Sequence, residues 1–128
     1  RNSFLTLREP DASETWMRSK IVTAQKDDVS EVLAFIRALA KYEKLEHEVT
    51  ATEEMLIKTL FGPNPYAEVV FLEDAGARVG FALFFHNYST FLAKPGIYLE
   101  DLFVKPEHRG KGFGKQLLVH LARLAWER

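Results

Sequence analysis

The sequence predicts an α+β fold in which helices pack on a mixed sheet, and two patterns support this class. Apolar residues recur at helical spacing in residues 29–40 and 113–125, which indicates amphipathic helices. Residues 67–72, 79–86 and 97–104 are β-rich runs separated by turn-forming or polar segments. With 128 residues, 47% of them hydrophobic and 27% charged, the chain fits one globular domain with a hydrophobic core.

The chain is expected to begin with a tail. Residues 1–18, RNSFLTLREPDASETWMR, show no sustained period and include turn-forming residues, so we expect a tail or an extension there. The folded domain is then expected at residues 19–128. Its first element is a short strand predicted at residues 20–24.

Two helices are predicted next, each opened by a capping-box spacing. Asp28 and Glu31 mark the start of the first helix, which is expected to end near Tyr42. Thr50 and Glu53 repeat the spacing for a second, shorter helix, which Gly62, Pro63 and Pro65 should end. The apolar stripe of the first helix is expected to comprise Val29, Val32, Leu33, Ile36, Leu39 and Ala40, and that of the second Met55, Leu56, Leu60 and Phe61.

The three later β-rich runs predict a hairpin and a bulged strand. Asp74 and Gly76 suit the turn of an antiparallel hairpin, and a loop is expected at residues 87–96. In IYLEDLFV, residues 97–104, the alternation of apolar residues breaks at Glu100 and Asp101. A β-bulge at this point would return Ile97, Leu99, Leu102 and Val104 to one face.

The stretch EHRGKGFGKQLL, residues 107–118, places three glycines and three basic residues in front of the last predicted helix. A helix N-terminus presents unpaired N–H groups and partial positive charge, and glycines let an anion approach the backbone. This composite pattern favours a phosphate site over the alternative of a solvated turn. The stripe of the last helix is expected to comprise Phe113, Leu117, Leu118, Leu121, Leu124 and Ala125.

Two familiar phosphate-binding motifs do not fit this stretch. A P-loop requires four residues between its glycines and a hydroxyl after the lysine, whereas Gly110 and Gly114 are closer and Gln116 follows Lys115. A dinucleotide-binding fingerprint requires Gly-x-Gly-x-x-Gly, whereas here the spacing is Gly-x-Gly-x-Gly.

The stretch YLEDLFVKPEHRGKGFGKQLL, residues 98–118, instead resembles the acetyl-CoA-binding core of the GCN5-related N-acetyltransferases (GNATs). The pyrophosphate loop of that family reads Gln or Arg, two residues, Gly, one residue, and Gly or Ala; Arg109, Gly112 and Gly114 occupy these positions. The resemblance extends over residues 19–128, because a strand, two helices, a hairpin, a bulged strand and a loop with its helix follow in the family's order.

Within the family, LAKYEKLEHEV (residues 39–49) together with YLED (residues 98–101) is most similar to the diamine, polyamine and thialysine acetyltransferases. The resemblance implies that Glu100 is the general base and that acetyl-CoA is the cosubstrate. It further implies acceptor-side positions at Tyr42, Glu43 and Asp101, with Asp101 as a weaker candidate for the base. The cofactor-binding residues that it implies are Leu102, Phe103, Val104, Arg109, Gly110, Lys111, Gly112, Phe113, Gly114 and Lys115.

The implied reaction is direct transfer of an acetyl group to the primary amine of a diamine, a polyamine or a lysine-like acceptor. A homodimer in the cytoplasm is expected. Family members continue beyond the pyrophosphate helix with further strands and a tyrosine proposed to protonate the leaving thiolate. The core is therefore expected to be truncated at its C-terminus and weakly active or inactive alone. A non-catalytic module that binds CoA or dimerises is the alternative.

Composition narrows the partners. Seventeen Lys and Arg against 18 Asp and Glu give a net charge of −1, so we expect neither a nucleic acid nor a membrane partner. No cysteine is present, and the four histidines lack ligand-like spacing, so no metal site is expected. Residues 43–54 hold five acidic side chains against one lysine. This segment either attracts a cationic acceptor or is simply solvated, and the sequence leaves both readings open.

Overall fold

The computed structural model describes residues 18–128, so the expected tail lies outside the described residues apart from Arg18. One four-stranded sheet has the order β1-β2-β3-β4, and every pairing in it is antiparallel. Its strands are β1 (Ser19–Thr23), β2 (Glu68–Asp74), β3 (Ala77–Ser89) and β4 (Lys94–Val104). The helices are α3 (Val29–Tyr42), α4 (Glu53–Leu60) and α5 (Phe113–Glu127), with short 3₁₀ segments η1 (Lys26–Asp28), η2 (Glu46–Glu48) and η3 (Pro106–His108). The expected α+β class is confirmed, but the sheet of the described residues is antiparallel throughout and not mixed.

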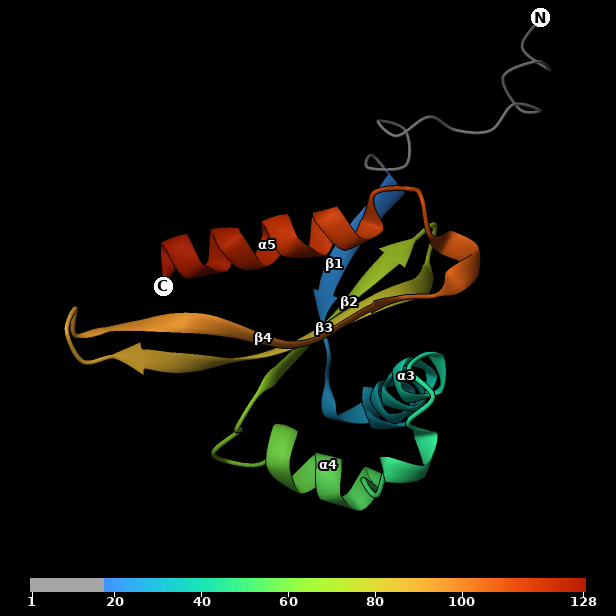
Figure 1. Cartoon of the computed structure of the whole chain (residues 1–128), viewed down its shortest axis with the longest axis horizontal. Helices are drawn as coiled ribbons and strands as arrows, with labels where there is room; N and C mark the ends of the chain where they lie inside the picture. The colour runs from blue at the N-terminus through green and yellow to red at the C-terminus, as the bar shows by residue number, and fades with distance from the viewer. Residues whose placement is uncertain (1–17) are drawn as a thin grey trace, which may run out of the picture.

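The helices cover both faces of the sheet (Figure 1), with α3 and α4 on one side and α5 on the other. Side chains alternate along a strand, so neighbouring residues of β2 enter different cores. Phe71 packs with Phe35 of α3, whereas Leu72 packs with Leu117 of α5. All four of these side chains are at most 2% exposed. The sheet is therefore buried on both faces between two hydrophobic cores.

Asp28 is the N-cap residue of α3, as predicted, but the capping box lies one turn earlier. The backbone N–H of Gln25 donates to Asp28 Oδ2 at 2.7 Å. Gln25 is therefore the first residue of the capping box, and Asp28 is its last. Glu31 pairs with Arg78 of β3 instead, at 2.7 Å. Phe35 was missing from the predicted stripe but is only 2% exposed, because its ring packs against Phe71 and Phe81 of the sheet.

The cap residue of α4 and part of its apolar stripe were predicted wrongly. Thr52, and not Thr50, is the N-cap residue, and its hydroxyl accepts from the Met55 backbone N–H at 3.2 Å. Met55 itself is 50% exposed, whereas Leu56 is buried. The helix ends at Leu60, as the following Gly-Pro sequence predicted.

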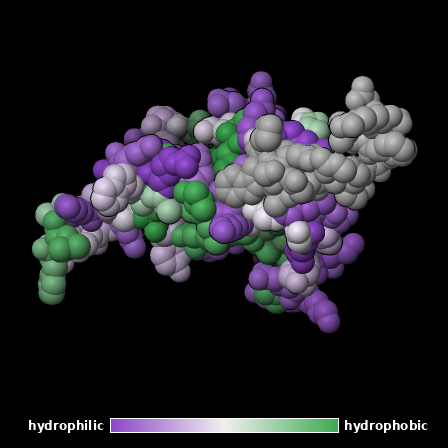
Figure 2. All heavy atoms as spheres, turned by 90° about the horizontal axis from the view of Figure 1, so that it is seen from above, coloured by the Kyte–Doolittle hydropathy of each residue, from purple (hydrophilic) through white to green (hydrophobic). Residues whose placement is uncertain are grey.

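The hairpin turn is confirmed, but the expected loop at residues 87–96 is wrong. Ala75 and Gly76 have φ angles of 51° and 86°, as a two-residue type I′ turn requires. The pairing of β3 with β4 continues to Ser89 and Lys94, which leaves only residues 90–93 as a turn. These strand ends form a projecting arm (Figure 1), and the tip of the arm is apolar (Figure 2).

The predicted bulge in β4 is confirmed. Leu83 pairs with Asp101 and Phe84 pairs with Leu99, so Glu100 has no partner on β3. The extra residue restores the parity of the strand. Four apolar residues consequently pack against the core beneath α5, namely Ile97, Leu99, Leu102 and Val104.

The buried stripe of α5 is narrower than predicted. Phe113, Leu117 and Leu121 are buried as expected, but Leu118 is 50% exposed and Ala125 is exposed. The stripe instead includes the polar residue Gln116, whose Oε1 accepts from the Ser19 hydroxyl at 3.0 Å. This helix therefore packs on the sheet through a narrow buried face.

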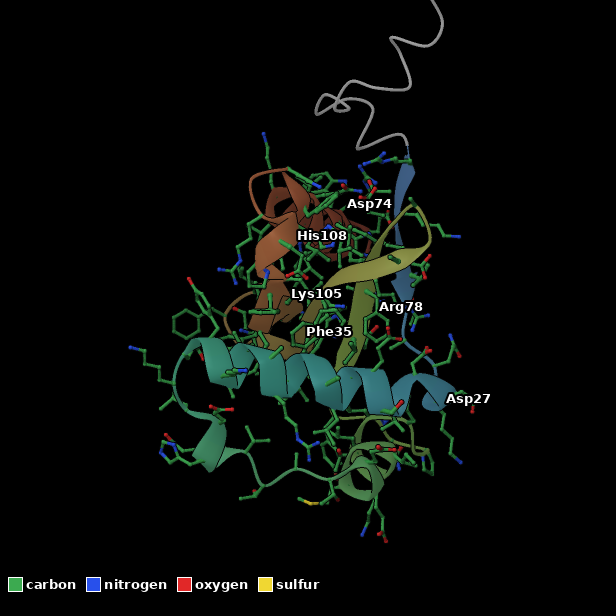
Figure 3. All side chains as sticks on the ribbon, turned by 90° about the vertical axis from the view of Figure 1, so that its right-hand side faces the viewer. Asp27, Phe35, Asp74, Arg78, Lys105 and His108 are labelled. Carbon is green, nitrogen blue, oxygen red and sulfur yellow. The ribbon has the colours of Figure 1, made fainter. Side chains whose placement is uncertain are left out.

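Arg78 joins α3 to the sheet (Figure 3). Its Nη1 donates to Asp28 and Glu31 at 2.8 and 2.7 Å, and its Nε donates to Glu73 at 3.3 Å. Burial alone would raise the pKa of Asp28, but the hydrogen bonds from the Gln25 backbone and from Arg78 outweigh it and lower that pKa. The network fixes α3 beneath the strands that carry the site.

Candidate functional site

A groove of about 380 Å³ lies between the C-terminal end of α3, the second half of β4 and the loop before α5. Leu39 and His108 also line the groove, and neither was predicted from the sequence as a site residue. Leu39 lies one helical turn before Tyr42 on α3, and this i, i+3 spacing was a usable signal. The predicted residues that line the groove are Tyr42, Glu43, Leu102, Phe103, Val104, Arg109, Gly110, Gly112, Phe113 and Gly114.

Two glycines shape the loop at one end of this groove. Gly110 and Gly112 have φ angles of 81° and 82°, a region that other residues rarely enter. Among residues 18–128, no group accepts a hydrogen bond from the backbone amides of residues 110–115. Successive unpaired amides beside positive-φ residues form a concave anion-binding surface.

The electrostatics of the helix start agree with this geometry. Gly112 is the N-cap residue of α5, so no side chain caps the helix, and its first turn holds no acidic residue. The partial positive charge of the N-terminus is therefore not neutralised locally. Lys111 and Lys115 flank the loop, although neither lines the groove. The arrangement can bind a phosphate group or a diphosphate group.

Arg109 turns back onto the end of β4. Its Nε donates to the Val104 carbonyl oxygen at 2.9 Å, and its guanidinium lies against the Tyr42 ring. The Lys105 N–H donates to Val79 on β3, so the alternation of an antiparallel ladder turns the backbone groups of Leu102 and Val104 away from β3. Because β4 is the last strand of the described sheet, these groups face an open edge, where Arg109 occupies the Val104 carbonyl oxygen and leaves the Leu102 groups and the Val104 N–H accessible.

The bulge gives two adjacent carboxylates different surroundings. Glu100 is exposed and lies outside the residues that line the groove. Asp101 is half-buried; this burial, together with the negative charges of Glu100 and Glu43, raises the pKa of its carboxyl group. A half-buried carboxyl group with a raised pKa is typical of a functional position.

A smaller cavity of about 190 Å³ lies next to the groove, and Leu39 and Glu43 line both. Asp101 and Glu48 also line it, and its remaining lining residues are apolar. Three carboxylates around an apolar floor suit an organic cation. The structure therefore brings Glu43 and Asp101 together, as the acceptor-side prediction requires.

One further polar atom lies in the groove. The Nδ1 of His108 is buried and has no hydrogen-bond partner within residues 18–128. The side chain belongs to η3, immediately before the glycine loop (Figure 3). Over the same part of the chain, no group of three or more His, Cys, Asp or Glu residues has a metal-binding arrangement.

Comparison with known proteins identifies the family. Residues 33–128 match the family model for the acetyltransferase (GNAT) family. The chain belongs to the GNAT acetyltransferase family. The resemblance noted in the sequence is thus confirmed.

Relatives of this GNAT chain include enzymes that act on small amines. It is 36% identical to the thialysine N-epsilon-acetyltransferase of Sus scrofa over 113 residues, covering 82% of this chain and 66% of the pig protein. It is 33% identical to an L-ornithine N5-acetyltransferase of Arabidopsis thaliana, covering 91% of this chain and 72% of that protein. The chain thus spans just under two thirds of the length of the pig relative.

Solved structures support the same fold. An integron cassette protein from the mobile metagenome of V. cholerae has a TM-score of 0.68 at 25% identity, over 87% of this GNAT chain and 70% of that one. An aminoglycoside acetyltransferase from a soil metagenome has a TM-score of 0.75 at 21% identity, over 89% and 74%. Within residues 18–128, the structure has no helix with the length and apolarity to cross a membrane.

Proposed function

We propose that this protein transfers an acetyl group from acetyl-CoA to the primary amine of a small diamine, polyamine or lysine-like acceptor. The observation that carries the proposal is the run of unpaired backbone amides at residues 110–115, which lies at the mouth of a groove. The amide run fits a diphosphate, because glycine leaves the backbone accessible and no group within residues 18–128 accepts from these amides. The thialysine and ornithine acetyltransferases among the relatives favour an amine as the acceptor.

The residues of the groove suit the parts of this cosubstrate. The loop from Arg109 to Lys115 would hold the diphosphate. The Leu102 backbone groups and the Val104 N–H, which face the open edge of β4, would pair with the amide-containing pantetheine arm. Binding an extended arm along a strand fixes its orientation. Fixed orientation replaces a bimolecular encounter by a nearly unimolecular one, which contributes much of the acceleration in such reactions.

The acidic cavity next to the groove would bind the acceptor. Glu43 and Asp101 line it, and their negative charge attracts an alkylammonium group. Tyr42 lies on the wall of the groove beside them. Of the two readings of the acidic segment, attraction of a cation is the one that this cavity favours.

The amine must lose a proton before it reacts, because an alkylammonium with a pKa of about 10 has no free lone pair. Glu100 at the bulge is the proposed base, acting through water, and Asp101 is the weaker candidate. The raised pKa of Asp101 is the observation that keeps this candidate open. As the nitrogen forms its bond to the acetyl carbon, the carbon–sulfur bond breaks, and the proton that the nitrogen loses passes to the leaving thiolate.

The remaining expectations belong to the same proposal. A homodimer in the cytoplasm is proposed from the family resemblance, without a nucleic acid or membrane partner. Relatives extend beyond the matched region, so the 128 residues alone are proposed to turn over weakly. A CoA-binding module without chemistry is the second candidate, because the groove and loop are present whether or not transfer occurs.

Calorimetric titration with CoA, together with thiol release from acetyl-CoA over a panel of amines, tests the proposal. We expect saturable binding of CoA and thiol release that depends on a diamine or a lysine-like amine. Binding without release from any amine would favour the non-catalytic module. An absence of CoA binding would contradict both candidates.

A further inference from the structure

The guanidinium of Arg109 is held in an aromatic corner. Its Cζ lies 4.2 Å from the centroid of the Tyr42 ring and 5.2 Å from that of Phe103. The two rings meet edge to face, with centroids 6.1 Å apart and planes at 64°. Phe103 is only 4% exposed and is fixed by the core. The Val104 carbonyl oxygen accepts from Nε, so both the face and one edge of the guanidinium are fixed.

The other edge of the guanidinium has no hydrogen-bond partner in the part of the chain that the structure describes. A guanidinium carries five N–H groups, and only Nε of Arg109 has a hydrogen-bond partner among residues 18–128. The Nη1 and Nη2 groups are left to donate, in the fork geometry that matches two oxygens of a phosphate. An arginine fixed before binding loses less side-chain entropy when the ligand arrives. The corner therefore presents a preorganised donor beside the glycine loop.

Tyr42 contributes little to the core. Its side chain is 60% exposed at the end of α3, and the ring contacts that define its position are with Phe103 and Arg109. Stacking of a cation on an aromatic face stabilises its position. Removal of this ring should therefore loosen Arg109 without opening a cavity in the core.

We propose that Tyr42 is a positioning residue for the cofactor half of the site, because it holds Arg109 in the orientation that binds a phosphate group. The inference rests on the proposed function and deepens it. The family resemblance gives Tyr42 an acceptor-side position, which predicts that its replacement weakens binding of the amine. The stack on Arg109 predicts instead that its replacement weakens binding of CoA.

Calorimetric titration of CoA into matched tyrosine variants tests this role. Tyr42→Ala should weaken CoA binding about fivefold, and Tyr42→Phe, which keeps the ring face, should stay within about twofold of the wild type. Tyr88→Ala is the control, because Tyr88 is 64% exposed on the projecting arm. In steady-state assays, Tyr42→Ala should raise KM for acetyl-CoA and leave KM for the amine unchanged. Equal CoA affinity in Tyr42→Ala and wild type would overturn the inference.

A double-mutant cycle tests whether Tyr42 acts through Arg109. Arg109→Ala removes the guanidinium that the ring holds, so Tyr42→Ala should have no further effect on CoA affinity in that background. The same fivefold loss in both backgrounds would show that the ring acts by another route and would overturn the inference.

A measurement without ligand separates this inference from the proposed function. In the unliganded protein, the Arg109 Nε–H should give a protected NMR resonance that persists in Tyr42→Phe and broadens or disappears in Tyr42→Ala. A resonance that is unaffected by loss of the ring would overturn the inference even if CoA binds. A wild-type protein that shows the protected resonance but does not bind CoA would overturn the proposed function. It would also overturn the role of the Arg109 guanidinium in binding a phosphate group.

Discussion

Asp101 pairs with Leu83 across the sheet, whereas its neighbour Glu100 has no partner on β3. One extra residue in β4 thus separates two carboxylates that are adjacent in the chain. Glu100 remains exposed, and Asp101 turns into a half-buried position near Glu43. Different surroundings should give the two carboxylates different functions, and their amide variants distinguish these functions.

Replacement of Glu100 should affect turnover and leave binding intact. Glu100→Gln keeps the size of the side chain but removes the proton acceptor, so kcat should fall about 100-fold or more. CoA affinity should stay within about twofold of wild type, because Glu100 does not line the groove. Thiol release at saturating acetyl-CoA and calorimetry measure the two quantities. A variant with wild-type turnover would remove Glu100 from the mechanism.

Asp101→Asn should stabilise the protein while impairing use of the amine. The folded state raises the pKa of this carboxyl group above 3.8, so stability is lost as the pH rises through the folded pKa. The asparagine side chain of the variant does not ionise, so the variant avoids this loss of stability. The melting temperature of Asp101→Asn should therefore exceed that of the wild type at pH 7 but not at pH 3. The KM for the amine should rise, because the cavity loses a negative charge. Equal melting temperatures at both pH values would contradict this account.

Asp28→Asn should show the opposite pH dependence. The pKa of Asp28 is lowered in the folded state, so its carboxylate contributes stability above pH 3.8 that is lost as the pH falls through the folded pKa. The amide variant should be less stable by about 1 kcal/mol at pH 7, because the bond to Arg78 loses its charge. Denaturant unfolding at several pH values should show this deficit shrinking in acid. A deficit that is independent of pH would assign the effect to geometry alone.

The parts of the fold that could be predicted are those determined by local sequence patterns. The helix from Val29 to Tyr42 follows from its apolar stripe, and the bulge at Glu100 follows from the broken alternation between Leu99 and Leu102. The glycine loop is likewise a local pattern, because Gly110 and Gly112 adopt the positive φ angles that only glycine enters easily. Each of these features depends on residues close together in the chain.

The errors arise where two local signals compete or where distant residues decide. Thr50 and Thr52 are both suitable caps, and only the path of the chain into α4 selects Thr52. The strands beyond Asn87 contain polar residues and a proline, but cross-strand pairing extends them as far as Ser89. The contact between Tyr42 and Arg109 joins α3 to the glycine loop, and no local pattern encodes that approach.

The most direct test of the central claim compares two glycines with the same backbone strain. Gly110 and Gly76 have φ angles of 81° and 86°, and an added Cβ at either would meet no atom within 4 Å. Gly110→Ala and Gly76→Ala should therefore each lose about 1 kcal/mol of stability. Only Gly110→Ala places a methyl group where the diphosphate must approach the amides. Calorimetric titration with CoA should show binding weakened about 10- to 100-fold in Gly110→Ala and unchanged in Gly76→Ala. Equal CoA affinity in the two variants would contradict the assignment of the loop as the diphosphate site.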